Sequence, residues 1–444
     1  MCGIEHLISN FEINYSTVML SYSKFALFFI LLFTCITRCF YFSNNTQNGY
    51  NATSWDALGY YMYLPSTVIY NDVKTLDWLP EIDSTYHVTG GKLYQAIQLE
   101  NGGYTNKYFC GIALLESPFF FLAHGYAHAF ESKKNHVIPD GFSWPYQYAI
   151  LFGAIFYVFL GLLFLRKVLL SFFSEKVTAL TLVLLVCGTN LLQYAAIDGA
   201  MSHVFIFPLY AIIIWATIKW HESPKIKFAL IIGLLSGIAT ISRPTEAIII
   251  FIPIFWSLHS KVESSAKWLK VNLHKSHVVV AGVGGIIGVL PQFIYWKYTT
   301  GSWLFDVGSK WYFLNPWWRV LFGHEQGWFM YTPLAIAMII GFWFMKNQPF
   351  RKSVVFFCLV NIWVIISWSD WHYGASYSTR ALVQSYPVFA LPLACLINYV
   401  MVERKKVLIV LGVSGFLIFL NVYQLRIYNT GVIDDFSPFY HLFK

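Results

Sequence analysis

Long apolar runs alternate with short polar connections along most of this chain, and twelve such runs can be distinguished. They cover residues 25–42, 109–130, 146–165, 177–196, 203–219, 227–242, 245–258, 278–297, 327–345, 353–368, 382–400 and 407–425. Runs of about 20 apolar residues can cross a bilayer as helices. None alternates between apolar and polar positions as the strands of a membrane barrel do. The pattern therefore predicts an all-α polytopic membrane protein in which residues 1–444 form one membrane domain.

The basic residues of the short loops predict how these helices are oriented. Lys and Arg cluster in the loops 166–176, 219–227, 261–275, 346–352 and 404–406. With Lys24, these loops hold 17 of the 30 Lys and Arg, and basic loops face the cytoplasm. All five can do so only if residues 109–130 form a re-entrant or surface-lying helix. We therefore expect about eleven transmembrane helices, with the N-terminus inside and the C-terminus outside.

Composition agrees with a chain that lies largely in a bilayer. Hydrophobic residues make up 57% of the chain and charged residues only 12%, with a mean hydropathy of +0.55. Because a soluble domain carries about 25% charged residues, this chain cannot cover a soluble surface. Its net charge of +8 comes mainly from the basic loops, so we expect membrane lipids and no nucleic acid as partners. The seven Cys form no CxxC or CxxH pair, which argues against a disulfide framework or a zinc site.

Ionisable residues gather at the outer ends of the predicted helices rather than in the middle of spans. The outer side then has four distinctive regions, which are a first loop at 43–145 with juxtamembrane helices, the turns at 197–202 and 243–244, an aromatic loop at 298–326 and a late loop at 369–381. Transporters usually place ionisable groups in mid-span. The distribution therefore predicts an active site at the boundary between the membrane and the water outside.

Two acidic residues in the outer regions are candidates for catalysis. Asp56 begins an amphipathic stretch soon after the first span, where it either caps a helix or acts as a general base toward an acceptor hydroxyl group. Asp198 lies at the junction of two spans, five residues before His203, and is either a polar cap or a second carboxylate that orients the substrate. Lys107 precedes the run 109–130, and it either anchors that helix at the interface or faces a lipid phosphate.

Arg243 lies between two short apolar runs, at 227–242 and 245–258. Because runs this short do not reach the ordinary bilayer surface, we expect the turn between them to be recessed. An arginine at such depth needs a partner. That partner is either the carboxylate of Glu246 or the phosphate of a ligand, since a guanidinium group binds phosphate oxygens bidentately.

The aromatic loop 298–326 is rich in Trp, Tyr and Phe. Such a loop either lies on the membrane surface as an interfacial helix or offers flat rings on which a sugar can stack. His324 and Glu325 lie where this loop re-enters the membrane. We therefore count both among the candidate substrate-binding residues.

The late loop combines Gly, Ser, Thr and Tyr with charged side chains. His372 and Tyr377 in this loop are candidates for contacts with a substrate. Arg380 at its end either snorkels to the interface or joins Lys107 and Arg243 as a third cation for an anionic ligand. The chain has no Walker A or GxGxxG fingerprint for a nucleotide. A phosphate-bearing lipid is therefore the activated molecule that we expect on this face.

These residues resemble the GT-C class of integral membrane glycosyltransferases, in particular the group of protein O-mannosyltransferases and aminoarabinose transferases. In that class a catalytic Asp follows the first span, as Asp56 does within Trp55–Tyr61, and a further Asp lies at a later outer junction, as Asp198 does. A basic residue leads the segment after the first loop, as Lys107 does. The segment Tyr373–Arg380 is similar to a late Gly/Arg loop of bacterial members.

The resemblance implies a GT-C-like fold in the inner membrane and transfer of a sugar from a polyprenyl-phosphate donor on the periplasmic face. Asp56 would deprotonate a hydroxyl group of a glycan, lipid or protein acceptor, and the sugar would invert its configuration. Arg243, with Lys107 or Arg380, would stabilise the leaving phosphate.

The same resemblance gives Asp198 and His203 the role of orienting hydroxyl groups. The chain also departs from the class. Asp56 is followed by Ala57 rather than by a second acid, and no Lys-Pro-Pro or His-Pro-Pro motif follows the first loop. We therefore expect no cofactor, while a divalent metal ion stays open.

Two other functions share these features. A transporter or flippase for lipid-linked sugars would also have many spans and phosphate-binding cations, but we expect it to have mid-span ionisable groups and related halves. An O-antigen ligase or polymerase would carry several Arg in a large late loop, whereas the late loop here has only Arg380. The sequence therefore favours a glycosyltransferase, and it leaves the sugar and the acceptor open.

Overall fold

The computed structural model describes residues 21–44, 52–374 and 376–430. Within these ranges the chain is mostly helical, and its sheet consists of two short strands. Six of the described helices are long and apolar enough to cross a membrane, at Tyr22–Tyr41, Trp144–Leu170, Ser202–Glu222, Lys275–Thr300, Arg380–Met401 and Lys405–Asn429. In its broad architecture the chain is therefore an all-α membrane protein, as the apolar runs predicted.

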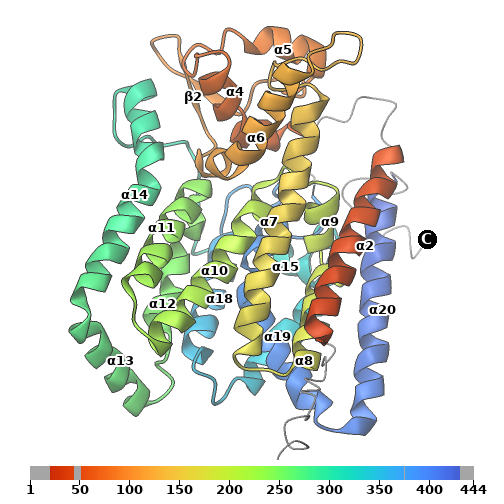
Figure 1. Ribbon diagram of the computed structural model, residues 1–444, viewed down its shortest axis with the longest axis vertical. Helices are drawn as coiled ribbons and strands as arrows, with labels where there is room; N and C mark the ends of the chain where they lie inside the picture. The colour runs from red at the N-terminus through yellow and green to blue at the C-terminus, as the bar shows by residue number, and fades with distance from the viewer. Residues whose placement is uncertain (1–20, 45–51, 375, 431–444) are drawn as a thin grey trace, which may run out of the picture.

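One long helix and a polar cap come first in the chain. Helix α2 (Tyr22–Asn44) precedes the cap, which we define as residues 52–143 and which covers one end of the molecule (Figure 1). The cap elements are α3 (Asp56–Tyr61), α4 (Tyr63–Val68), α5 (Leu79–Tyr86), β1 (Ala96–Gln98), β2 (Tyr104–Asn106) and α6 (Gly111–Ala129). The two strands pair antiparallel, with Ile97 opposite Thr105. The cap forms most of the predicted first outer loop, so that loop is folded rather than extended.

The helical body follows the cap. It consists of α7 (Trp144–Leu170), α8 (Glu175–Cys187), α9 (Leu191–Ala196), α10 (Ser202–Glu222), α11 (Ile226–Ser242), η2 (Pro244–Ile250), α12 (Phe251–Phe255), α13 (Lys261–Leu273), α14 (Lys275–Thr300), α15 (Arg319–Phe322), α16 (Trp328–Tyr331), α17 (Leu334–Ile340), η3 (Gly341–Phe344), α18 (Arg351–Ile366), η4 (Arg380–Ser385), α19 (Tyr386–Met401) and α20 (Arg404–Asn429). Helices α10 and α19 are the most enclosed of the long helices, whereas α14 and α20 expose most of their apolar side chains. These two exposed helices lie on opposite sides of the body (Figure 1).

Some predicted spans are broken into shorter pieces. The run 177–196 forms α8 and α9, and the run 327–345 forms α16, α17 and η3. Proline contributes to the second break, because it has no N–H group to continue the preceding helix. Pro333 lies between α16 and α17. The expected number of about eleven spans therefore stays a prediction.

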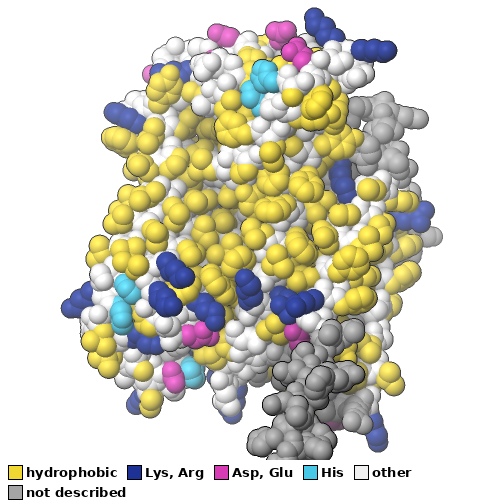
Figure 2. Space-filling model, in the orientation of Figure 1, with side chains coloured by type: hydrophobic (Ala, Val, Ile, Leu, Met, Phe, Trp, Pro, Cys, Tyr) yellow, Lys and Arg dark blue, Asp and Glu magenta, His cyan; other side chains and the backbone are white. Residues whose placement is uncertain are grey.

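Three chain segments meet at the end of the body opposite the cap. Arg166 near the end of α7 pairs with Glu175 at the start of α8 (N–O distance 3.1 Å) and donates a hydrogen bond to Ser23 at the start of α2. Figure 1 shows the starts of α13 and α20 at this same end, and Figure 2 shows a band of Lys and Arg side chains near it. Hydrophobic side chains cover the middle of the molecule (Figure 2). The predicted basic loops thus gather at one end, which we call the basic end.

Helix α6 lies beside only the part of α7 that is nearest the cap. Tyr157, in the middle of α7, donates a hydrogen bond to the carbonyl oxygen of Leu115 near the start of α6 (2.7 Å). The hydroxyl group of Tyr146, near the start of α7, contacts His124 near the end of α6 (2.6 Å). The two helices are therefore antiparallel, and α6 rises from mid-depth toward the cap. That residues 109–130 do not cross the membrane stays a prediction, as does the orientation of the whole chain.

Helices α11 and α14 pack closely through glycines. A side chain on Gly233 or Gly237 of α11 would collide with the backbone of α14, and one on Gly288 of α14 would collide with the backbone of α11. Small residues permit such close approach in membranes, where packing rather than water drives the association of helices. The contact holds α11 in place, and the end of α11 positions Arg243.

Candidate active site under the polar cap

Asp56 lies at the first position of α3, with both carboxylate oxygens held by side chains from other segments. Its Oδ1 accepts hydrogen bonds from the phenols of Tyr94 (2.8 Å) and Tyr108 (2.6 Å). Its Oδ2 forms an ion pair with Nη2 of Arg380 at 2.5 Å. The N-cap residue of α3 is Trp55, without a side-chain cap. The carboxylate is therefore the centre of a polar cluster, and the alternative of a helix cap does not hold.

The environment of Asp56 keeps its carboxyl group ionised. Burial raises the Asp56 pKa, but the charge of Arg380 and the hydrogen bonds from Tyr108 and Tyr94 outweigh it, so the pKa lies below its usual value. Burial and the nearby Asp56 charge raise the pKa of both phenols. Tyr94 and Tyr108 therefore remain protonated donors at neutral pH, and Asp56 remains an anion.

Arg380 points into the cluster rather than toward the surface. Its side chain is only 13% exposed, and its Nη1 lies 4.0 Å from the sulfur of Met201. Gly374 of the late loop adopts a left-handed backbone with φ 67°, and a Cβ placed there would lie 3.6 Å from Nη2 of Arg380. A glycine suits this positive φ, because it has no Cβ. The alternative of a snorkelling arginine is therefore wrong.

Arg243 is the second guanidinium group of the cluster, and it is held differently. Its Nη1 lies 3.4 Å from Nδ1 of His203 on α10. Among the described residues, no carboxylate forms an ion pair with it. The alternative in which Glu246 pairs with Arg243 is therefore not what the structure shows.

Glu246 is instead held by neutral donors below Arg243. Its Oε2 accepts a hydrogen bond from Tyr210 (2.6 Å), and its Oε1 accepts one from Nε2 of Gln384 (2.9 Å). Because the amide nitrogen of Gln384 faces Glu246, its oxygen faces Nδ1 of His203, at 2.9 Å. Nδ1 therefore carries the imidazole proton. Nε2 of His203 is left as a buried acceptor with no hydrogen-bond partner among the described residues.

Asp198 occupies the turn between α9 and α10. Its Oδ2 accepts a hydrogen bond from Gln193 (2.9 Å), and the amide of Gln193 exchanges hydrogen bonds with Asn429 at the end of α20. Burial raises the Asp198 pKa, and the bond from Gln193 and the charges of Arg380 and Arg38 offset only part of that effect. The N-cap position of α10 is Met201, so Asp198 does not cap that helix.

The turn before α10 connects these groups into one site. Arg380 pairs with Asp56, and its Nη1 lies 4.0 Å from the sulfur of Met201, which follows Asp198 and precedes His203 in the sequence. Arg243 lies 3.4 Å from Nδ1 of the same His203. The structure therefore gathers five of the ten predicted site residues, from segments that lie far apart in the sequence. We refer to Asp56, Asp198, His203, Arg243 and Arg380 as the arginine cluster.

Lys107 borders the arginine cluster without a contact of its own in it. Its side chain is exposed, and no described residue pairs with it. The residues beside it are built into the site, because Tyr108 binds Asp56 and Asn106 donates a hydrogen bond to the carbonyl of Gly59 (2.7 Å). The predicted residue Lys107 therefore lies near the site, but the side chain that contacts Asp56 is that of its neighbour Tyr108.

His324, Glu325 and His372 lie outside the arginine cluster. The side chains of His324 and His372 are exposed, and His372 pairs with Asp370 at 2.8 Å on the surface. The neighbouring Gln326 is buried and supports the late loop through the carbonyl of Gly374 and the hydroxyl of Ser376, at 3.0 Å each. These three predicted residues therefore do not lie with the five residues of the arginine cluster. They belong to the late loop or to the segment that packs against it.

Tyr377 is buried, and its hydroxyl group points toward α20 rather than toward the cluster. It lies 3.2 Å from side-chain oxygens of both Asn421 and Gln424. The carbonyl oxygen of Tyr377 accepts a hydrogen bond from Tyr194 (3.1 Å). This tyrosine therefore anchors the late loop, and its hydroxyl group is not placed to contact a substrate in the arginine cluster.

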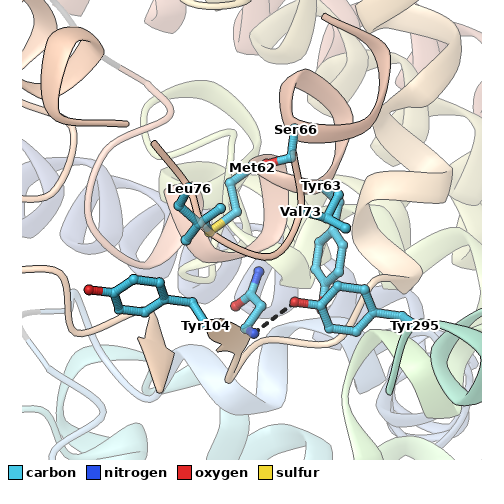
Figure 3. Close-up of a pocket in the computed structure, with 8 residues that line it drawn as sticks. Met62, Tyr63, Ser66, Val73, Leu76, Tyr104 and Tyr295 are labelled. Atoms are coloured by element: carbon cyan, nitrogen blue, oxygen red, sulfur yellow. Dashed lines mark hydrogen bonds between the residues drawn. The ribbon is translucent and has the colours of Figure 1, made fainter. Parts of the chain in front are cut away.

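A small pocket lies between the cap and α14 (Figure 3). It is lined by Met62, Tyr63, Ser66, Val73, Leu76, Tyr104, Asn106 and Tyr295. Figure 3 shows Tyr104 and Tyr295 on either side of it, and Tyr295 accepts a hydrogen bond from the backbone N–H of Asn106 (2.9 Å). The phenol of Tyr63 donates to the carbonyl of Tyr108 (2.5 Å). The pocket and Asp56 are therefore connected through the short segment that contains Lys107.

No metal-binding group can be recognised in the part of the chain that the structure describes, since no three His, Cys, Asp or Glu side chains come together suitably. Comparisons with protein-family models, with curated proteins and with solved structures found no match to this chain. The chemistry of the site is therefore argued from its own residues.

Proposed function

We propose that this chain is a glycosyltransferase of the GT-C type that moves a sugar from a polyprenyl-phosphate donor to an acceptor hydroxyl group. One observation carries the proposal. A carboxylate, Asp56, and two guanidinium groups, Arg380 and Arg243, lie in one cluster, and Arg243 has no carboxylate partner among the described residues. An unpaired guanidinium group in a membrane protein is well suited to a phosphate.

The position of the cluster supports a donor on the outer face. Asp56 belongs to the cap, which lies opposite the basic end of the body (Figure 1). If the basic end faces the cytoplasm, the cluster faces the periplasm across the inner membrane. A lipid-linked sugar carries its own activated phosphate there, and no nucleotide is needed.

Asp56 acts in this proposal as the general base. The acceptor hydroxyl group transfers its proton to the carboxylate while its oxygen forms a bond to the anomeric carbon of the sugar. The bond between that carbon and the phosphate oxygen breaks, and polyprenyl phosphate leaves with the bonding electrons. The sugar ends on the acceptor with inverted configuration, and the proton ends on Asp56.

Arg243 and Arg380 stabilise the leaving group. The phosphate gains one negative charge as the bond to the sugar breaks, so fixed cations beside it lower the barrier. Losing one such interaction typically costs on the order of 10²–10³ in rate. Asp198 and the free Nε2 of His203 are acceptors that can orient sugar or acceptor hydroxyl groups.

A transporter for lipid-linked sugars is the second candidate, and one observation favours it. Glu116 of α6 is fully buried, and neither of its carboxylate oxygens has a hydrogen-bond partner among the described residues. Buried ionisable groups in membrane proteins often mark transport pathways. The two functions differ in their product, because a transferase separates the sugar from the lipid phosphate and a transporter leaves the donor intact.

The test uses the purified full chain in lipid nanodiscs, with radiolabelled polyprenyl-phosphate sugars and a panel of glycan, lipid and peptide acceptors. We expect sugar transfer by the wild type and a loss on the order of 10²–10⁴ for Asp56→Asn. Asp306→Asn is the matched control, since Asp306 is exposed and, among the described residues, its side chain accepts a hydrogen bond only from Gly308 in its own turn. Near-wild-type transfer by Asp56→Asn would remove the base from the proposal. Movement of intact donor across vesicles, without cleavage, would support the transporter instead.

A further inference from the structure

Asp56 and Arg380 neutralise each other in the structure, although the proposed reaction needs each for a different partner. Nη2 of Arg380 lies 2.5 Å from Oδ2 of Asp56, and the two side chains are 13% and 25% exposed. A base must present a free oxygen to the acceptor hydroxyl group, and a phosphate clamp must present a free guanidinium group. The resting contact satisfies neither requirement.

We propose that the ion pair between Asp56 and Arg380 is an internal lock, which the donor phosphate opens by taking Arg380 and thereby exposing Oδ2 of Asp56. This inference rests on the proposed function, and it deepens that function by making the base available only after the donor has bound. The donor phosphate and the Asp56 carboxylate are competing anions for one guanidinium group.

The two oxygens of Asp56 are held in a way that suits such a lock. Tyr94 and Tyr108 both donate to Oδ1, and Arg380 alone holds Oδ2 among the described side chains. When Arg380 moves, the two phenols keep the carboxylate in position. Oδ2 then becomes the free acceptor for a proton, without a change in the placement of α3.

Arg380 also lies close to the groups that Arg243 contacts. Its Nη1 lies 4.0 Å from the sulfur of Met201, two residues before His203. Nη1 of Arg243 lies 3.4 Å from Nδ1 of that His203. A phosphate first bound by Arg243 would therefore meet Arg380 at short range and draw it from Asp56.

The lock predicts an order of binding. The donor binds first, because its phosphate is the group that releases the base. An acceptor hydroxyl group that arrives without a donor meets a carboxylate already occupied by a guanidinium group. Water meets the same occupied carboxylate, so the resting protein is protected from unproductive proton transfer.

The test measures phosphate binding and needs no catalysis. The full chain in phosphatidylcholine nanodiscs is titrated with polyprenyl phosphate without a sugar, and in a second arm with inorganic phosphate. We expect Asp56→Asn to bind polyprenyl phosphate about tenfold more tightly than the wild type, since Arg380 no longer has a competing anion. Arg380→Gln should bind it more weakly, and the double variant should match Arg380→Gln. Asp306→Asn should bind as the wild type does, and thermal unfolding confirms that each variant is folded.

The outcomes separate the lock from the proposed function. Equal or weaker binding by folded Asp56→Asn, with the wild type binding and Arg243→Ala binding less, overturns the lock and leaves the transferase proposal standing. Absence of binding by the wild type in both arms overturns the proposed function, and the lock with it. A gain in both arms supports a lock opened by the phosphate group itself. A gain with polyprenyl phosphate alone supports a lock that opens only for a lipid-linked phosphate. Should Asp56→Asn unfold, Asp56→Ala takes its place, and a folded Asp56→Ala that binds no more tightly than the wild type overturns the lock.

Discussion

Arg380 and Arg243 lie in the same cluster, but their guanidinium groups are held in opposite ways. Arg380 makes a direct ion pair with Asp56 at 2.5 Å. Arg243 has a carboxylate, Glu246, three residues away in the sequence, yet Glu246 is bound by Tyr210 and Gln384 instead. The charge of Arg380 is thus neutralised inside the protein, whereas the charge of Arg243 remains available to an anionic ligand.

The difference shows how a site can hold two cations for one anion. A buried charge without a partner is costly, so two free arginines side by side would destabilise the fold. Pairing Arg380 with Asp56 removes one of these charges in the resting protein. Because neutral donors bind Glu246, the charge of Arg243 is not neutralised by it. A phosphate can then pair with Arg243. The predictions below test whether the two halves of the cluster really differ.

Among the tests of this comparison, we expect the largest effect from the arginine without a carboxylate. Arg243→Ala should lower kcat/KM for transfer by about 10²–10³ and weaken the binding of polyprenyl phosphate, because the phosphate loses a fixed cation. Arg319→Ala is the control, since the guanidinium group of Arg319 lies 4.6 Å from the ring centroid of Trp371, a residue outside the arginine cluster. Unchanged donor affinity in Arg243→Ala would contradict the assignment of the free guanidinium group to phosphate.

Glu246 should act on stability more than on the donor. Glu246→Gln places an amide against the donors of Tyr210 and Gln384, and an unsatisfied buried group costs about 1–3 kcal/mol. Thermal unfolding should show this loss, and Tyr210→Phe should show a smaller loss. Donor affinity should change far less than in Arg243→Ala. An equal loss of affinity in both variants would mean that Glu246 and Arg243 work as a pair, and the comparison would fail.

The two aspartates of the cluster should affect stability in opposite directions at neutral pH. The Asp56 pKa is lowered in the fold, so its charge stabilises the fold above its unfolded pKa, and that stability is lost as the pH falls through the folded value. The Asp198 pKa is raised, so its charge costs stability at pH 7, and the fold gains stability as the pH falls through the raised value. Asp56→Asn should therefore lower the thermal stability at pH 7, and Asp198→Asn should raise it. Shifts of the same sign would refute this account.

The smallest effects are expected outside the arginine cluster. His324→Ala and His372→Ala should change the transfer rate by less than about twofold, because both side chains are exposed and the ion pair of His372 with Asp370 is on the surface. The measurement is the same transfer assay at saturating donor. A loss as large as that of Arg243→Ala would show that the substrate reaches further along the late loop than the cluster extends.

Much of the site was visible in the sequence, because position at the end of an apolar run is a local property. Asp56, Asp198, Arg243 and Arg380 each stand where a helix meets a polar segment. That pattern selected residues that the structure brings together. The same rule also selected Tyr377, whose position in the late loop is right but whose hydroxyl group points into the helical body.

Other members of the site gave no sequence signal. Tyr94 is one of 29 tyrosines, and nothing in its surroundings marks it as a partner of Asp56. Tyr108 directly follows Lys107, which was selected from the sequence, so the sequence pattern missed the side chain that contacts Asp56 by one position. Gln384 lies within an apolar stretch and connects Glu246 to His203. Such partners depend on which side chains face each other across the fold, and a linear pattern does not contain that information.

Sequence alone determined that this chain is helical, that it belongs in a membrane and where its positive charge concentrates. Hydropathy and charge add up along short windows, so they can be read without knowing the fold. The tertiary structure alone decided that Asp56 pairs with an arginine 324 residues away and that Arg243 does not pair with its near neighbour Glu246. Ion pairs require atoms within a few ångströms, and that proximity arises only when α3, α10, α11 and η4 are packed together.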